Sequence, residues 1–73
     1  YMRKGIAIAK DNMTYPEYEP RLLWIKGVAY EVTENDGTLS IVSEYDGAFH
    51  FTGVAREQLD NCFEFTFEPP KGE

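Results

Sequence analysis

His50 and Cys62 are the only histidine and the only cysteine in the sequence, so a search for catalytic chemistry begins with them. A thiolate nucleophile needs a base beside it, and His50 could in principle meet Cys62 across a sheet. Cys62, however, begins an alternating apolar run, where cysteine usually behaves as a small hydrophobe. His50 alternates with Phe49 and Phe51 and is expected to point outward. We therefore predict no catalytic Cys–His pair.

The sequence also gives little support for a metal site or for a catalytic pair of carboxylates. A structural zinc site needs four Cys or His ligands, and the chain contains two such residues in total. Paired carboxylates can support glycoside hydrolysis, but 13 acidic residues among 73 make chance pairs certain. Four acids at hairpin ends match no calcium-loop spacing: Glu34, Asp36, Glu44 and Asp46. Phosphate-binding loops and nucleophile elbows are also missing. We predict a protein that is not an enzyme and needs no metal or cofactor.

The charge balance bears on the partner. The formal net charge is -6, with seven scattered cationic residues. Nucleic-acid binding relies on Lys and Arg to displace phosphate counterions, so the composition disfavours it. The acidity serves solubility, and it would also suit a basic protein partner. No stretch of about 18 apolar residues and no signal peptide are visible, so we expect a cytoplasmic protein without a membrane segment.

The length of 73 residues allows one domain, with residues 1–2 as its N-terminus and 68–73 as a flexible tail. Eleven aromatic residues can supply a dense core. Short alternations of apolar and polar residues predict strands at 3–9, 28–33, 39–45, 48–52 and 62–67. In the first strand, we expect Ile6 and Ile8 to point inward.

The segments between these strands carry turn and loop signals. Asn35-Asp36-Gly37 and Asp46-Gly47 predict two tight hairpin turns. Residues 54–60 suit a short helix with Ala55 and Leu59 on one face, and residues 10–20 predict a long loop. We expect the apolar run 21–25 to be the first half of a bent strand, broken at Lys26-Gly27. The sequence thus predicts an all-β fold, a small five-stranded barrel with a helical turn before the last strand.

This element order resembles the Src-homology-3-like barrel, which has a long first loop, two hairpins and a helical turn before its last strand. A second resemblance covers about residues 24–65. It consists of Lys26-Gly27-Val28-Ala29-Tyr30-Glu31-Val32, Asp46-Gly47-Ala48-Phe49-His50-Phe51 and Cys62-Phe63-Glu64. This pattern is similar to small phage and prophage proteins, most of them uncharacterised. The resemblance implies a protein that acts inside a bacterial host cell.

The long loop is the predicted interaction surface, because unusually long loops often carry function. We expect Tyr15, Glu17, Tyr18 and Glu19 at its centre, with Trp24 nearby. Tyrosine and tryptophan are frequent hot-spot residues, although the two tyrosines could instead cap the barrel. The predicted function is an acidic binding protein that engages, or inhibits, a host or phage protein.

Alternative functions are the capture of a signalling nucleotide and a structural or assembly role. For the nucleotide, Tyr15, Tyr18 or Trp24 would stack on the base, and Arg3, Lys4 or Arg21 would hold the phosphates. The apolar first strand and the short chain favour a homodimer weakly.

Overall fold

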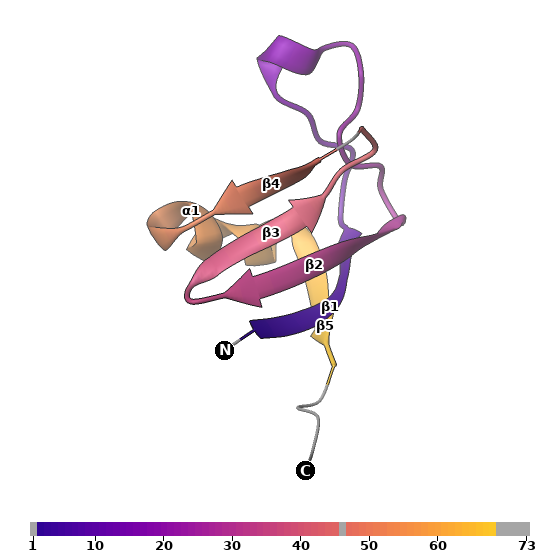
Figure 1. Cartoon of the computed structure of the whole chain (residues 1–73). Helices are drawn as coiled ribbons and strands as arrows, with labels where there is room; N and C mark the ends of the chain where they lie inside the picture. The colour runs from indigo at the N-terminus through magenta and orange to yellow at the C-terminus, as the bar shows by residue number, and fades with distance from the viewer. Residues whose placement is uncertain (1, 46, 69–73) are drawn as a thin grey trace.

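Five segments with alternating side-chain burial form one antiparallel sheet in the computed structural model, which describes residues 2–45 and 47–68. The strands are β1 (Met2–Ala9), β2 (Ala29–Asn35), β3 (Thr38–Val42), β4 (Ala48–Phe51) and β5 (Phe63–Phe67). Their order in the sheet is β4-β3-β2-β1-β5 (Figure 1). The predicted all-β, five-stranded fold is confirmed. Asp46 and the predicted tail from residue 69 onward lie outside the described residues.

The sheet is strongly curved, and its two ends face a common core. Trp24 contacts Phe51 on β4 and Phe63 on β5, at ring-centroid distances of 6.3 Å and 5.5 Å. Strands β4 and β5 occupy opposite edges of the sheet, so a single side chain can touch both only if the sheet curls around it. The largest fully buried side chains are those of Leu23, Val32 and Ile41.

The inward face of β1 differs from the prediction. Ala7 and Ala9 are buried, whereas Ile6 is 49% and Ile8 37% exposed. The register pairs Ala7 with Phe65 and Ala9 with Phe63, so large aromatic rings on β5 occupy the space beside the inward face of β1. Small residues fit there, and the larger isoleucines lie on the outer face of the sheet.

The two hairpins differ in length. Asp36 and Gly37 adopt φ values of 52° and 84°, and they close the predicted tight turn between β2 and β3. Strand β3 ends at Val42 rather than at the predicted residue 45, so residues 43–47 form a longer connection to β4. The buried Ser43 hydroxyl donates to the carbonyl oxygen of Tyr45 at 2.7 Å. Such a local bond competes with strand pairing and ends the ladder.

The predicted helical turn before the last strand is present as α1 (Gly53–Glu57) followed by the 3-10 helix η2 (Gln58–Asn61). Leu59 is buried and closes one end of the core, but Ala55 is exposed. The change from α-helix to the tighter 3-10 helix rotates later residues relative to earlier ones. Residues four apart therefore do not share a face here, and that part of the prediction was wrong.

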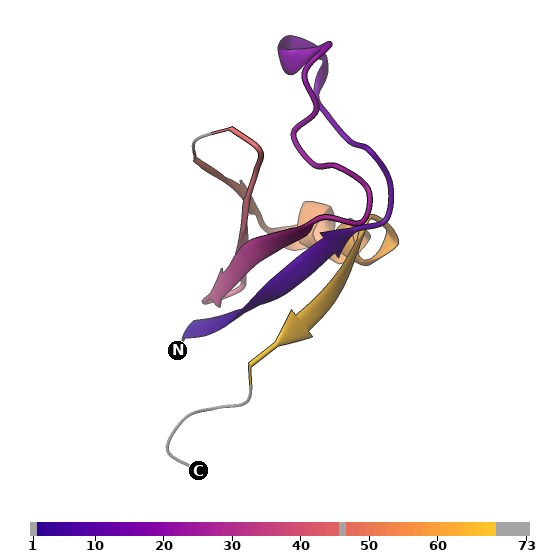
Figure 2. The ribbon, with the colours of Figure 1, turned by 90° about the vertical axis from the view of Figure 1, so that its right-hand side faces the viewer.

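A long connection of residues 10–28 joins β1 to β2, and it stands away from the sheet (Figures 1 and 2). Its tip contains the short 3-10 helix η1 (Pro16–Tyr18). The run 21–25 is the return arm of this loop rather than the first half of a bent strand. An isolated bridge between Met13 and Trp24 joins the two arms, and a turn at Lys26-Gly27 leads into β2.

Candidate functional site

The long loop is held to the sheet at its base. Backbone bonds join Met13 and Trp24 in both directions, at 2.9 Å and 3.1 Å. Nearer the sheet, the side-chain oxygen of Asn12 accepts a hydrogen bond from the backbone N–H of Lys26 at 2.8 Å. The backbone N–H of Glu44 also donates to the carbonyl oxygen of Leu23 at 2.8 Å. These bonds connect both arms of the loop to each other and to the β3–β4 hairpin.

The tip of the loop has a defined conformation as well. The N–H of Tyr18 donates to the carbonyl oxygen of Tyr15, and the N–H of Arg21 donates to that of Tyr18, both at 2.9 Å. Pro16 occupies the first position of η1, where its fixed φ suits a helical start. The side chains at the tip are therefore presented from an ordered backbone.

Three aromatic rings meet where the loop faces β4. The ring centroid of Phe49 lies 5.6 Å from that of Tyr15 and 5.7 Å from that of Tyr18. Beneath them, the ring of Trp24 is 5.3 Å from Phe49. Tyr15 and Tyr18 nevertheless remain 38% and 41% exposed. The two tyrosines thus pack against the domain and also face solvent, and their part in partner binding stays a prediction.

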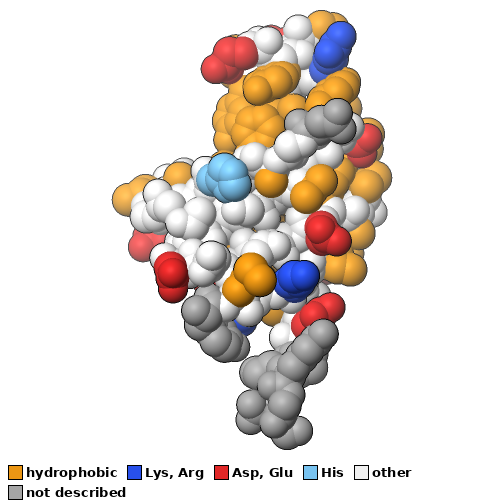
Figure 3. Space-filling model, in the orientation of Figure 1, with side chains coloured by type: hydrophobic (Ala, Val, Ile, Leu, Met, Phe, Trp, Pro, Cys, Tyr) orange, Lys and Arg blue, Asp and Glu red, His pale blue; other side chains and the backbone are white. Residues whose placement is uncertain are grey.

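Acidic side chains lie beside these rings. Glu17 and Glu19 are exposed and flank Tyr18 in the sequence. Figure 3 shows hydrophobic side chains gathered where the loop meets the sheet, with both acidic and basic groups next to them at the tip. We call the set Tyr15, Glu17, Tyr18, Glu19 and Phe49 the loop surface. Phe49 was not among the predicted site residues, although its place in a short aromatic strand was a hint.

Trp24 belongs to the core rather than to the surface. It is 3% exposed, and its indole N–H donates to the carbonyl oxygen of Val42 at 3.0 Å. Its role is to support the rings of Tyr15 and Phe49 from below. We therefore remove Trp24 from the predicted contact residues.

The surroundings of Tyr15 change its acidity. Partial burial raises the pKa of the Tyr15 hydroxyl, and the negative charges that Cys62 and Glu17 can carry raise this pKa further. Tyr15 therefore stays a neutral hydrogen-bonding group well above physiological pH. Cys62 and Tyr15 also line the same pocket.

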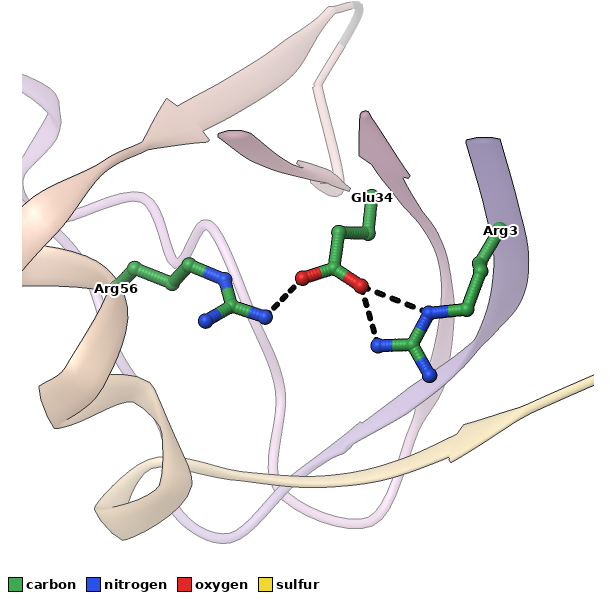
Figure 4. Close-up of polar contacts among 3 residues, drawn as sticks. All are labelled: Arg3, Glu34 and Arg56. Atoms are coloured by element: carbon green, nitrogen blue, oxygen red, sulfur yellow. Dashed lines mark hydrogen bonds and ion pairs between the residues drawn. The ribbon is translucent and has the colours of Figure 1, made fainter. Parts of the chain in front are cut away.

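A second polar cluster lies at the other end of the sheet and was not predicted. The Glu34 carboxylate on β2 accepts hydrogen bonds from Arg3 on β1 and from Arg56 on α1 (Figure 4). The bond from Arg3 Nε measures 2.7 Å, and the Arg3 guanidinium also lies 4.1 Å from the centroid of the Phe67 ring. Both arginines lower the pKa of Glu34. The cluster joins three elements that are distant in sequence.

The residues suggested for nucleotide capture are not brought together. Arg3 is bound to Glu34, Trp24 is buried, and the Arg21 guanidinium lies over the ring of Tyr45 at 5.4 Å. Lys4 lies on the outer face of β1, where it lines a groove with Ile6. No observation here favours the nucleotide hypothesis.

His50 and Cys62 have different surroundings. His50 is exposed on the outer face of β4, and its Nδ1 lies 2.6 Å from the Ser40 hydroxyl. Cys62 is a half-buried free thiol that packs against the core. Within residues 2–45 and 47–68, no three His, Cys, Asp or Glu side chains are grouped as metal ligands would be. In the same residues, no helix is long and apolar enough to cross a membrane.

Comparisons with protein-family models, with curated proteins and with solved structures each found no match for this chain.

Proposed function

We propose that this domain is a non-enzymatic protein-binding module that engages its partner through the loop surface. The observation that carries the proposal is the packing of Tyr15 and Tyr18, on an anchored loop, against Phe49 of β4, with both tyrosines about 40% exposed. Rigid aromatic groups give contact area at a low cost in conformational entropy. A backbone that is already ordered lowers this cost again.

The charge of the loop surface points to a basic partner. Glu17 and Glu19 add two negative charges beside the aromatic rings, in a chain whose net charge is -6. Lysine and arginine side chains of a partner could pair with these carboxylates and lie over the tyrosine rings. Complementary charge of this kind accelerates association and selects among partners.

The biological setting follows from the sequence pattern over residues 24–65, which resembles small phage and prophage proteins. We place the protein in the bacterial cytoplasm, where it would engage a host or phage protein. Occupation of the basic site of a host enzyme would make it an inhibitor.

Capture of binding proteins from bacterial lysates tests the proposal. The wild-type domain should recover a stoichiometric partner, and the double variant Tyr15→Ala/Tyr18→Ala should lose it. A second variant, Glu17→Gln/Glu19→Gln, should weaken capture by about tenfold or more at low salt, which corresponds to about 1.4 kcal/mol. The loss should shrink as salt rises, because screening weakens charge pairs at the surface.

The matched control removes the same charge elsewhere. Glu64 and Glu68 are exposed on the strand β5 side of the sheet, so Glu64→Gln/Glu68→Gln changes the net charge equally without touching the loop surface. This control should retain the partner. If capture falls equally in both charge variants, or if wild type recovers nothing from several hosts, the proposed function is wrong.

A further inference from the structure

An apolar pocket opens directly beside the loop surface, between the long loop and the helical turn. Met13, Thr14 and Tyr15 form one wall, and Trp24, Cys62 and Phe63 form much of the rest. Trp24 and Phe63 are almost fully buried, whereas Tyr15 is 38% exposed. The pocket therefore begins at the proposed interaction surface and ends against the hydrophobic core.

Several of the polar groups in these walls are already used. The Trp24 indole N–H donates to Val42, and the Thr14 hydroxyl donates to the carbonyl oxygen of Tyr15. The backbone groups of Met13 and Trp24 bond to each other, and the N–H of Cys62 donates to Leu59. A polar ligand entering this pocket would find few groups to replace its bonds to water, which is costly. An apolar group carries no such cost.

The size of the pocket narrows the choice of occupant. Its volume is about 200 Å³. Apolar cavities of roughly 150 Å³ in proteins bind benzene-sized molecules. The space suits a single phenyl-sized group and is small for a nucleotide or a whole peptide segment.

We infer that this pocket receives one phenyl-sized apolar side chain of the bound partner, anchored between Tyr15 and Phe63. The inference rests on the proposed function, because Tyr15 belongs to both the loop surface and the pocket. Interfaces commonly bury such an anchor in a pocket near their centre and carry a polar rim around it, to which Glu17 and Glu19 would belong here. The partner is therefore a basic protein surface with a protruding aromatic residue.

Cys62 allows the pocket to be tested without knowing the partner. In thiol–disulfide exchange, the Cys62 thiolate attacks one sulfur of a symmetrical disulfide, a mixed disulfide forms, and the other half leaves as a thiolate. The domain is equilibrated with equal amounts of two symmetrical disulfides, one with phenylethyl groups and one with hydroxyethyl groups. The two corresponding small thiols are also present, so that the exchange is reversible. Mass spectrometry then gives the ratio of the two adducts. The same measurement on the chain unfolded in urea gives the adduct ratio that the two reagents produce without a folded pocket.

We expect the phenylethyl adduct to be favoured in the folded protein at least about tenfold more than in urea. A tenfold preference requires the pocket to remove only about 55 Å² of the phenyl group's apolar surface from water, because each Å² contributes about 25 cal/mol. Equal ratios in the folded and unfolded protein would overturn the inference. An unreactive Cys62 in the folded protein would also overturn it, because the pocket would then be closed to a phenyl group.

Two controls separate the pocket from a general effect of folding. Thr14→Phe places a phenyl ring at the pocket mouth and should remove the preference. If that variant does not fold, excess free toluene should compete with the phenylethyl adduct in the wild-type protein. A preference that survives both the filled pocket and the competitor would contradict the inference.

A partner experiment then tests the anchor itself. The phenylethyl adduct should lose at least about tenfold in partner capture, and the hydroxyethyl adduct should retain it. Normal capture by the phenylethyl adduct would show that the partner does not use the pocket. The failure to find any partner would instead count against the proposed function, and the adduct ratio would still report on the pocket.

Discussion

Gly5 lies on the inward face of β1, where it pairs with Phe67 of β5. A Cβ atom at this position would lie 2.8 Å from the Cα atom of Phe67 and even closer to the carbonyl oxygen of Thr66. Both neighbours are backbone atoms of a paired strand, so they can move only if the strand moves. The close pairing of these two strands therefore depends on the missing side chain.

We predict that Gly5→Ala lowers the free energy of unfolding by about 1–3 kcal/mol, the usual cost of overpacking. Ile6→Ala, one position along on the exposed face, should cost less than about 1 kcal/mol. Urea unfolding followed by tryptophan fluorescence measures both. Equal losses for the two variants would show that the inward and outward faces of β1 are assigned incorrectly.

Glu34 supplies a pH-dependent contribution to stability. Its pKa is lowered by hydrogen bonds from Arg3 and by the charge of Arg56, against the opposing effect of burial. A lowered pKa in the folded state means that the contribution is present above the ordinary value of 4.5 and is lost as the pH falls through the folded pKa. Both arginine side chains are more than one-third exposed, so solvent screens the pairs.

For Glu34→Gln we expect a loss of less than about 1 kcal/mol at pH 7. The difference from wild type should shrink below pH 4.5 and vanish once wild-type Glu34 is protonated. Urea unfolding between pH 7 and pH 2 follows this change. A difference that stays constant over the whole range would mean that the carboxylate charge contributes nothing.

At the scale of elements, Tyr30 connects the sheet to the long loop. Its hydroxyl donates to Glu44 Oε2 and accepts a bond from the backbone N–H of Ile25, each at 2.7 Å. The same hydroxyl thus joins β2, the return arm of the loop and the β3–β4 connection. Burial is the main cause of the raised pKa of Tyr30, and the hydrogen bond to Glu44 adds to it.

Tyr30→Phe should reduce the free energy of unfolding by about 1–3 kcal/mol, because the N–H of Ile25 loses its acceptor. Amide exchange should accelerate in residues 21–28 more than in β1. Tyr45→Phe is the matched control, since Tyr45 is 39% exposed. If exchange in the loop does not change, the hydroxyl is not what fixes the return arm.

At the scale of the whole molecule, the outer face of the sheet is apolar at its centre. Ile6 and Ile8 are each at least 37% exposed, and a groove of about 740 Å³ runs beside them. Lys4 and Glu68 line the same groove, so two copies can oppose unlike charges across it. Homodimer formation, which the sequence favoured weakly, stays a prediction, and this is the face that we expect to carry it.

Light scattering should show a mass that rises with concentration, and more steeply at high salt, where the repulsion between two chains of net charge -6 is screened. The variant Ile6→Lys/Ile8→Lys should remain monomeric and folded. Ile25→Lys, an exposed apolar residue of the loop arm, should leave association unchanged. A monomer mass at every concentration would end this expectation.

The sequence predicted the elements well because their signals are local. Asp36-Gly37 adopts the positive φ values that such pairs favour, and Phe63, Phe65 and Phe67 alternate as expected. The assignment of Ile6 and Ile8 to the core failed, because both faces of β1 are apolar and hydrophobicity alone does not choose between them. Of the residues in the candidate site, the four loop residues lie together at the tip, whereas Trp24 is buried and Phe49 was not predicted.

By itself, the sequence determined the all-β class, the positions of the five strands and the helical turn, and the long acidic-aromatic loop. Alternation, turn residues and proline placement act over a few residues, so they can be recognised without a structure. Tertiary structure decided which face of β1 is inward, how Glu34 meets two arginines, and where Phe49 and Cys62 lie. These outcomes depend on strand register and on the volume left by residues distant in sequence, which no local pattern specifies.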